Sequence, residues 1–575
     1  MSVTTTSKKD AAGPAETGPA GTGPAGAGQD GHGSAGTAPS GQDGSAAASR
    51  AAQPGLAAFV GTGPGSAELL TVRAAGLLSR ADLVFAGAEV TGRVRHLLPA
   101  TATIRTLAEL DADPRLLVKA VKAGQLAVAA YDGDPLLFGT AAAAAAACAK
   151  ARVRFEFVPG MPAATAVPAY AGIPLTSEAG GDVRILHAAD VSRLSAEAQP
   201  SRSLVILGVE AGPADVAKML MAAGWPERTP FTITWNGTTT EQLTIRCALG
   251  SVTADLQAAG VSLLTETGPA VGVVGEAAGP QQQDLSWFET KPLFGWRVLV
   301  PRTKEQAGSV SERLRAYGAV PEEVPTIAVE PPRTPHQMER AVKGLVTGRY
   351  QWVAFTSVNA VRAVREKLEE DGLDARAFAG VKVAAVGEQT GRALLDFGIK
   401  PDLVPEGEQS GEGLAAAWQP YDGLSDPINR VLLPRADIAT ETLVARLNEL
   451  GWETEDVTAY RTVRAAPPPA PIREAIKGGG FDAVLFTSSS TVRNLIGIAG
   501  KPHAVTVIAV IGPQTAKTAA EFGLRVDVKA PKPSATGLVD ALAEYAAGIR
   551  EAAIAAGEPV RKPSERRRGA RRRLR

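Results

Sequence analysis

The chain has 575 residues, too many for one ordinary hydrophobic core, so about three or four domains are expected. Its composition, 45% apolar and 21% charged, is that of a globular protein, and 60 basic residues balance 60 acidic ones. Two distant cysteines and five scattered histidines exclude a disulfide framework and predict no metal site. No apolar run is long enough to span a bilayer, and the first residues lack the order of a secretory signal, so we expect a cytoplasmic protein.

Both ends of the chain differ in composition from the rest. Residues 1–54 are mostly Gly, Ala, Ser, Pro and Thr and cannot bury enough apolar surface to offset their ordering entropy, so a disordered tail is predicted. Residues 547–575 form a basic C-terminal segment in which nine of the last 15 residues are Lys or Arg. A solvated tail is the simplest interpretation, and neutralisation of nucleic-acid phosphates is the alternative.

From Leu56 to about residue 280, short apolar runs alternate with helical patterns, which is typical of α/β layering. AAFVGTGPG predicts a strand and a glycine loop, and SAELLTVRAAGLLSRA predicts the helix that follows. Further strands are predicted by ADLVFAG, LAVAAYDG, RFEFVPG, SLVILG, TPFTITW and AVGVVGE. A polar break over 277–295 separates this region, 55–289, from a second one, 290–546.

The second region contains an internal duplication. Residues 352–364, WVAFTSVNAVRAV, and 381–405 have counterparts in 483–495, AVLFTSSSTVRNL, and 505–531. Each half predicts strand, Thr-Ser turn, helix, then strand, Gly-x-x-Thr turn, helix. Two similar α/β lobes are therefore expected, with ligands binding at the carboxyl ends of the strands.

The turns of this duplication are candidate anion sites, because hydroxyls cap the helices and free backbone N–H groups can bind an anion. Arginines that follow two other strands could add positive charge. For any single turn, simple helix capping without a ligand is the better interpretation, but four such turns favour an extended, multiply anionic substrate. The candidate residues are Arg302, Thr356, Ser357, Gly387, Thr390, Arg435, Thr487, Ser488, Gly512 and Thr515.

The ordered set VLVPRT, FTSVNAV, VGEQT, LLPRAD, VTAYRT, FTSSSTV and IGPQTA resembles the uroporphyrinogen-III synthase family. The resemblance covers residues 295–545 and implies two lobes linked by a pair of strands. Lobe one would combine 295–328 with 467–545, and lobe two would be 329–466. The resemblance implies hydroxymethylbilane, which carries eight carboxylates, as the substrate, and it implies a synthase without a cofactor.

The same resemblance implies the chemistry. The family's recurrent catalytic candidate, a tyrosine in V-x-x-Y-x-T, falls on Tyr460. The reaction would begin with loss of the terminal hydroxyl as water, and ring D would then attack through its substituted carbon and end up inverted. Tyr460 would donate a hydrogen bond or proton to the departing hydroxyl. A buried tyrosine that only packs is the alternative.

The first region resembles the tetrapyrrole methylases, among them the uroporphyrinogen-III C-methyltransferases. The resemblance rests on FVGTGPGSAELL, DGDPLLFG, FEFVPGMPAATAVPAYAGIPLT, WNGTTTEQ, VGVVGE and DLSWFE. It implies two α/β lobes, conversion of uroporphyrinogen III to precorrin-2, and S-adenosylmethionine bound near Pro64, Gly133, Asp134, Ala163, Leu207 and Gly237. A homodimer through this region is a further expectation from the family.

This region departs from its family at the expected base. The family's Tyr-Asp after the second strand is Ala86-Gly87 here, and seven alanines occupy 141–147, where the family carries a Gly-Gly-Glu-Glu-like run. Asp132 or Glu89 would have to replace the lost carboxylate. Methyltransferase activity and a degenerate or regulatory domain therefore both remain open.

Two other classes of protein fit parts of the sequence. A DNA-binding regulator fits the arginine tail, but no helix-turn-helix segment follows Tyr545. A two-lobe solute-binding protein fits the duplication but not the absence of a signal sequence. A fused enzyme of tetrapyrrole biosynthesis remains the leading hypothesis.

Overall fold

The computed structural model describes residues 55–176, 181–194, 202–261, 268–279, 285–302, 304–438 and 441–566. The predicted N-terminal tail lies outside these residues. They form four five-stranded sheets with helices on their faces, which confirms the prediction of two α/β regions. No helix in this part of the chain is long and apolar enough to cross a membrane.

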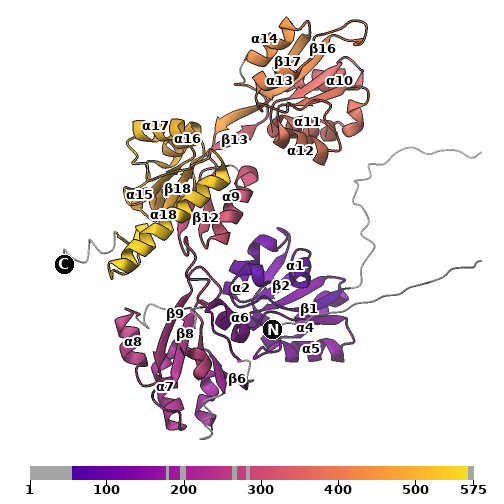
Figure 1. Ribbon diagram of the computed structural model, residues 1–575. Coiled ribbons are helices and arrows are strands. Elements are labelled where there is room, and N and C mark those ends of the chain that lie inside the picture. Colours follow the sequence, from indigo (N-terminus) through magenta and orange to yellow (C-terminus); the bar gives the residue numbers. More distant parts are fainter. Residues whose placement is uncertain are drawn as a thin grey trace, which may run out of the picture. The chain divides into compact units, whose positions relative to one another are not determined.

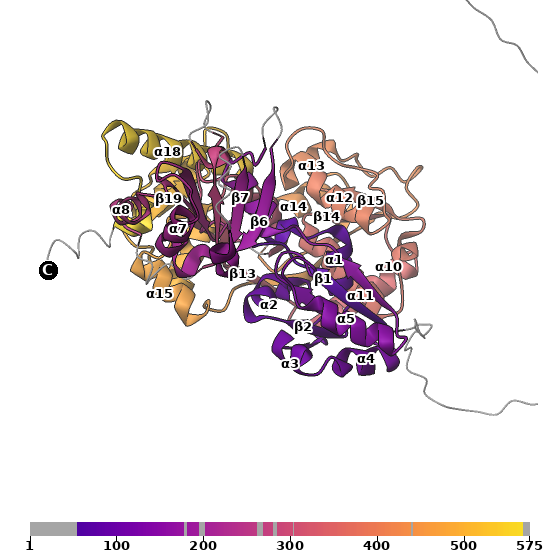
Figure 2. The same ribbon diagram turned by 90° about the horizontal axis from the view of Figure 1, so that it is seen from below.

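The first sheet is entirely parallel, with the order β3-β2-β4-β1-β5. Apolar side chains of α3, α4 and α5 cover one face, and those of α1 and α2 cover the other. Figure 2 shows α3, α4 and α5 together beside this sheet. Its elements are β1 (Leu56–Gly61), α1 (Val72–Leu78), β2 (Leu83–Ala86), α2 (Ala88–Val94), β3 (Thr103–Arg105), α3 (Leu107–Ala112), α4 (Arg115–Lys122), β4 (Leu126–Tyr131), α5 (Ala141–Lys150) and β5 (Phe155–Val158).

The second sheet is mixed, with the order β6-β7-β10-β8-β9. Only β6 and β7 are parallel, and α7 and α8 pack on one face while α6 packs on the other. Its elements are α6 (Ala163–Tyr170), β6 (Val183–His187), β7 (Ser203–Leu207), α7 (Pro213–Ala222), β8 (Pro230–Trp235), β9 (Leu243–Ala248), α8 (Val252–Ala258) and β10 (Ala270–Val274).

The third sheet, in lobe one, is parallel with the order β12-β11-β18-β19-β20. The helices α9 and α18 contribute to the core on one face, and α15, α16 and α17 to the core on the other. Its elements are β11 (Arg297–Val300), α9 (Lys304–Ala316), β12 (Val320–Glu323), α15 (Ala470–Gly478), β18 (Ala483–Phe486), α16 (Ser489–Ala499), β19 (Val507–Val510), α17 (Pro513–Glu521), β20 (Val528–Lys529) and α18 (Ala535–Ala555).

The fourth sheet, in lobe two, has the order β13-β17-β16-β14-β15, and only β13 is antiparallel to its neighbour. Figure 1 labels α10, α11 and α12 together; these helices share one core, and α13 and α14 share the other. Its elements are β13 (Ile327–Glu330), α10 (Pro335–Val346), β14 (Trp352–Phe355), α11 (Val358–Glu370), β15 (Lys382–Ala385), α12 (Glu388–Asp396), α13 (Gly411–Ala417), β16 (Arg430–Ala436), α14 (Thr442–Glu449) and β17 (Glu453–Arg464).

The twelve-residue strand β17 has two different neighbours and one bulge. The part from Glu453 to Tyr460 pairs with β16 in parallel, and the last four residues pair with β13 in antiparallel register. Thr458 lies opposite Arg435, but Tyr460 lies opposite Ala436, so Ala459 is an extra residue in the strand. As a result Ala459 and Tyr460, although consecutive, both belong to the core that α10, α11 and α12 cover.

Four aspartates extend the parallel ladders at the amino ends of the strands. In each, the backbone N–H donates to the carbonyl of one residue in the neighbouring strand, and the carboxylate accepts the N–H of that same residue. The pairs are Asp82 with Leu126, Asp402 with Val383, Asp482 with Arg297, and Asp527 with Ile508. Asp402 and Asp527 lie at matching places in the duplicated GIKPDLV and GLRVDVK.

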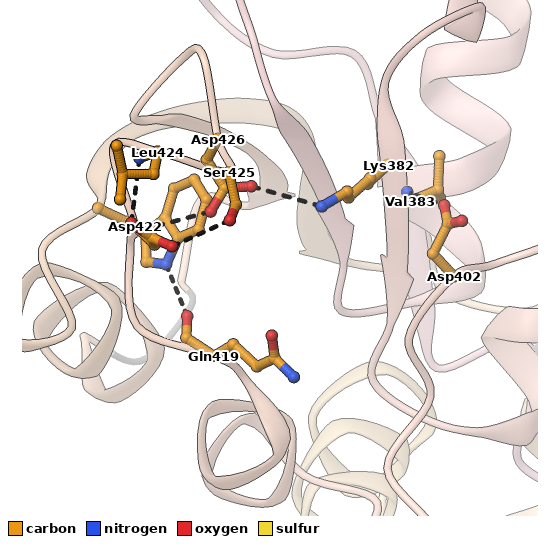
Figure 3. A network of polar contacts seen from close by, with 9 residues as sticks. Lys382, Val383, Asp402, Gln419, Asp422, Leu424, Ser425 and Asp426 are labelled. Atoms are coloured by element: carbon orange, nitrogen blue, oxygen red, sulfur yellow. Dashed lines mark hydrogen bonds and ion pairs between the residues drawn. The ribbon is translucent and has the colours of Figure 1, made fainter.

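The Asp402–Val383 pair lies close to a second polar network in lobe two (Figure 3). Lys382 Nζ lies 3.4 Å from the carboxylate of Asp426, which is buried. Asp422 accepts the N–H of Leu424 and the hydroxyl of Ser425, and these bonds hold the pKa of Asp422 below its ordinary value. These bonds fix the loop after α13 against the start of β15.

The structure extends lobe one beyond residue 546, into the segment predicted as a basic tail. Helix α18 continues to Ala555, and the backbone N–H of Ser564 donates to Asp482 Oδ1 at 2.9 Å. Pro563 is buried beside it. Asp482, only 1% exposed, therefore accepts a backbone N–H on each carboxylate oxygen. The arginines after residue 566 lie outside the described residues.

We predict that Asp482→Asn loosens this contact. An amide has one oxygen and cannot accept on both sides, so one buried N–H loses its acceptor at a cost of about 1–3 kcal/mol. Amides of residues 558–566 in the full-length chain should then exchange about 10- to 100-fold faster, measured by hydrogen exchange. Asp396→Asn, at the exposed end of α12, is the control. Unchanged exchange in the Asp482 variant would contradict this assignment.

Candidate functional site

Four strand-to-helix turns carry the residues expected to bind an anionic substrate. Thr356 and Ser357 join β14 to α11, and Thr487 and Ser488 join β18 to α16. Gly387 precedes α12, and Gly512 precedes α17. All four turns follow buried parallel strands, so within each lobe the two turns lie at the carboxyl edge of one sheet.

Both serines are helix caps. The N–H of Ala360 donates to Ser357 Oγ at 3.1 Å, and the N–H of Thr491 donates to Ser488 Oγ at 3.2 Å. Ser488 also donates its own N–H to Thr491 Oγ1 and lies 2.9 Å from Ser490 Oγ. The capping role weighed in the sequence analysis is therefore present at both turns.

The other two turns satisfy their amides differently. The side-chain oxygen of Gln409 accepts the N–H of Glu388, so a side chain already occupies the first amide of α12. In α17 the first residue is Pro513, which has no N–H to offer. Thr390 and Thr515 lie at the third position of their helices and are 4% exposed each, so they present little surface to a ligand.

Tyr460 meets one of these caps. Its hydroxyl lies 2.9 Å from Ser357 Oγ, and the residue is 7% exposed. The bulge in β17 turns Tyr460 toward the side of the sheet that carries α11. Ser357 and Tyr460, two candidates that the sequence suggested separately and that lie 103 positions apart, are therefore in contact.

In lobe one, a pocket of about 130 Å³ adjoins the second cap. This volume is below the roughly 300–1,000 Å³ that encloses a whole ligand. It suits one carboxylate-bearing substituent of a larger ligand. Burial lowers the pKa of Arg302, although a guanidinium remains charged at neutral pH. The pocket is lined by Pro301, Arg302, Thr326, Ile327, Thr487, Ser488, Ser490 and Thr491.

Three of these lining hydroxyls were missed at the sequence level. Ser490 and Thr491 belong to the run SSST, whose density of hydroxyls was a usable signal. Thr326 had no such signal, because it lies far from the turn in sequence and only the sheet brings it there.

Arg435 is placed differently from the other candidates. It is 3% exposed, and its guanidinium pairs with both carboxylate oxygens of Asp456, with Nε to Oδ1 at 2.9 Å. Asp456 lies on the neighbouring strand β17, so this pair braces β16 against β17. The positive charge of Arg435 is therefore compensated within the protein.

The first region has a cradle of close backbone contacts where its four expected cofactor loops meet. A Cβ atom added at Gly61 would lie 2.5 Å from backbone atoms of Gly133 and Gly160, and one at Gly160 would lie 1.9 Å from the Gly133 carbonyl. A Cβ at Gly65 would lie 2.8 Å from the carbonyl of Gly237. These glycines let the loops approach as no other residue could.

All of the expected cofactor residues except Leu207 lie in or directly beside these loops. Pro64 follows β1, Gly133 and Asp134 follow β4, Ala163 begins α6, Leu207 ends β7, and Gly237 follows β8. The carboxylate of Asp134 accepts the N–H groups of Leu136, Leu137 and Gly160, so Asp134 holds two of the loops together.

There is free space around Gly87, the position at which the resemblance led us to expect a general base. Gly87 precedes α2, and a Cβ added there meets no atom within 4 Å. Asp132, one candidate replacement, pairs with Arg93 at 2.5 Å, and Arg93 also lies 3.4 Å from the Thr62 hydroxyl. Glu89 is exposed on α2. Among the described residues, no group of three or more His, Cys, Asp or Glu is arranged to hold a metal ion.

Comparisons with known proteins match both regions. Residues 308–540 match the family "Uroporphyrinogen-III synthase HemD", and residues 58–253 match "Tetrapyrrole (Corrin/Porphyrin) Methylases". The chain is 30% identical over 511 residues to the "Porphyrin biosynthesis protein HemD" of Ruminiclostridium josui, covering 86% of this chain and 99% of that protein.

Two further relatives each match a part of the chain. The "Uroporphyrinogen-III synthase" of Synechococcus elongatus is 30% identical over 268 residues, which are 44% of this chain and 97% of that protein. The "Uroporphyrinogen-III C-methyltransferase" of Bacillus subtilis is 28% identical over 374 residues, 60% of this chain and 74% of that protein. The chain therefore belongs to the uroporphyrinogen-III synthase (HemD) family, with a tetrapyrrole methylase region in front of its synthase region.

Proposed function

We propose that the second region cyclises hydroxymethylbilane to uroporphyrinogen III, with loss of water and inversion of ring D. The observation that carries the proposal is the Tyr460 hydroxyl at the N-terminus of α11, 2.9 Å from Ser357, at the carboxyl edge of the lobe-two sheet. The relatives named as uroporphyrinogen-III synthases support the same reaction.

The first step is loss of the terminal hydroxyl. Tyr460 donates its phenolic proton to that oxygen, the carbon–oxygen bond breaks, and water leaves, while the electron pair of the adjoining pyrrole stabilises the azafulvene cation. Ring D attacks this cation through its substituted carbon and so forms a spiro intermediate. The spiro intermediate then rearranges, and ring D is inverted. Closure releases one proton, which restores the phenol. The overall change is a dehydration and requires no cofactor.

The enzyme must also hold the flexible, multiply anionic substrate in one conformation. The pocket beside Arg302 is lined by a guanidinium and several hydroxyls, groups that bind carboxylates. Thr356 lies at the turn beside Ser357, and Gly512 at the turn before α17, where either can meet further carboxylates. Arg435 is left out of this set because Asp456 compensates its charge.

We predict that Tyr460→Phe lowers kcat for the formation of uroporphyrinogen III (isomer III) about 100-fold without unfolding the protein. Loss of a general acid costs at least this much in rate. Full-length protein receives freshly generated hydroxymethylbilane without S-adenosylmethionine, and the oxidised porphyrin isomers are resolved.

Tyr545→Phe, a partly buried tyrosine of α18, is the matched control and should retain full turnover. If the unaltered chain yields isomer I alone, the proposed function is wrong. Full turnover by Tyr460→Phe would remove this tyrosine from the mechanism.

We also propose that the first region binds S-adenosylmethionine. The supporting observation is the glycine cradle, which leaves backbone groups of residues 61–66, 133–134, 160–163 and 237 close together. These residues would hold the cofactor, which supplies the methyl groups for C-methylation of uroporphyrinogen III to precorrin-2. Gly87 offers no carboxylate to take a proton, so this chain would rely on Asp132 once it is released from Arg93.

We predict that S-adenosylmethionine binds the full-length chain with one site per chain, measured by calorimetry. Gly160→Ala should abolish binding, because its Cβ would overlap the Gly133 carbonyl, whereas Gly76→Ala meets no neighbouring atom and should bind normally. Equal binding by both variants would place the cofactor elsewhere. In the isomer assay, conversion of isomer III to methylated products on addition of the cofactor would show that the region methylates.

A homodimer through the methylase region is a third proposal. In the described part of the chain β5 pairs with β1 alone, so one edge of β5 has unpaired backbone groups. Phe155 and Phe157 lie on this edge strand, pack against Phe59 and are 37% and 36% exposed. An apolar edge strand of this kind is a ready surface for a second copy.

We predict that the full-length chain sediments at twice its mass of 59.2 kDa. Phe155→Lys should convert it to a monomer, because a charge on the edge strand opposes pairing. Val72→Lys is the control, because Val72 is 92% exposed at the start of α1 and lies off this strand. A monomeric unaltered chain would overturn the proposal.

A further inference from the structure

Ser357 and Tyr460 are joined by two independent features of lobe two. The bulge at Ala459 turns the tyrosine toward α11, and the cap of α11 places Ser357 Oγ 2.9 Å from its hydroxyl. In a strand that kept Ala459 but alternated regularly, Tyr460 would point to the face covered by α13 and α14. The backbone of one strand and the cap of one helix therefore fix this hydrogen bond together.

Either hydroxyl of the Ser357–Tyr460 pair could donate, and the other bonds around Ser357 favour donation by the serine. Ser357 Oγ accepts the N–H of Ala360 at 3.1 Å, and its single proton has one polar neighbour among the described residues, the Tyr460 oxygen. The chain Ala360 N–H to Ser357 O–H to Tyr460 then runs in one direction, so each bond polarises the next. It begins at the positive end of α11 and leaves the phenolic proton of Tyr460 free.

We infer that Ser357 is a positioning residue, which holds Tyr460 by donating to the phenol oxygen and so presents the phenolic proton to the departing hydroxyl of the linear tetrapyrrole. The inference rests on the proposed synthase function. When the proton has passed to the leaving oxygen and water has left, the phenolate keeps the hydrogen bond from Ser357. The proton released on ring closure then returns to it.

The duplicated turn in lobe one shows that a cap alone does not create this arrangement. Ser488 caps α16 as Ser357 caps α11, but its hydroxyl contacts Thr491 N and Ser490 Oγ. Among the described residues, Ser488 has no tyrosine partner. The two halves of the duplication therefore differ in function at this position, with the proton donor in lobe two.

A double-mutant cycle on the full-length chain tests the inference. Ser357→Ala should lower kcat for isomer III about tenfold with KM changed less than twofold, because the phenol is mispositioned but still present. In a Tyr460→Phe background the same change should lower kcat less than twofold, because no phenolic proton remains to be positioned. Ser357→Thr, which keeps a hydroxyl and a cap, should restore kcat in the otherwise unaltered chain.

Ser410→Ala is the matched control. Ser410 caps α13 in the same lobe, accepting the N–H of Gly413 at 3.1 Å, and the variant should keep the kcat of the unaltered chain. Equal losses from Ser357→Ala in both backgrounds would show a merely structural cap and overturn the inference. If Tyr460→Phe leaves no measurable isomer III, the Ser357→Thr variant decides the question. The inference is overturned if the kcat of Ser357→Thr is as low as that of Ser357→Ala while its thermal midpoint is unchanged. Failure of the unaltered chain to make isomer III would instead overturn the proposed function.

Discussion

The first backbone N–H groups of a helix have no partner within the helix, and the candidate site depends on how each helix that follows a parallel strand satisfies them. In α11 and α16 a serine caps the end, in α12 the distant Gln409 accepts one N–H, and in α17 a proline removes one donor. Four turns that look alike in sequence therefore offer different chemistry, and at α11 alone of these four the cap also meets a tyrosine.

Much of the fold could be predicted because its parallel strands are buried on both faces. Strands such as β1, β4 and β7 are nearly continuous apolar runs, and glycine or hydroxyl turns mark their ends. The strands β3, β6 and β9 were not predicted. They are short, or partly exposed and interrupted by Arg or Thr, so their apolar pattern is weak and only pairing with neighbouring strands stabilises them.

The sequence could propose the candidate site residues one by one, but it could not predict their contacts. Tyr460, Ser357 and Arg302 stand in recognisable motifs. The structure places Ser357 and Arg302 just after strands, and Tyr460 within β17, opposite the last residue of β16. The partners that decide their roles come from far along the chain: Asp456 for Arg435, Gln409 for α12, and Arg93 for Asp132. No local pattern encodes such pairings, because strand order and register create them.

The bulge at Ala459 has a consequence for how this protein can change over evolution. Ala459 is an extra residue, so a strand without it would alternate regularly and would still place Tyr460 opposite Ala436, on the face that carries α11. Single-residue deletions between Asp456 and Tyr460 should therefore be tolerated better than single-residue insertions, which would need a second bulge to keep the tyrosine on this face. The length of this short stretch can then shrink by one residue during evolution without moving the tyrosine hydroxyl away from the cap of α11.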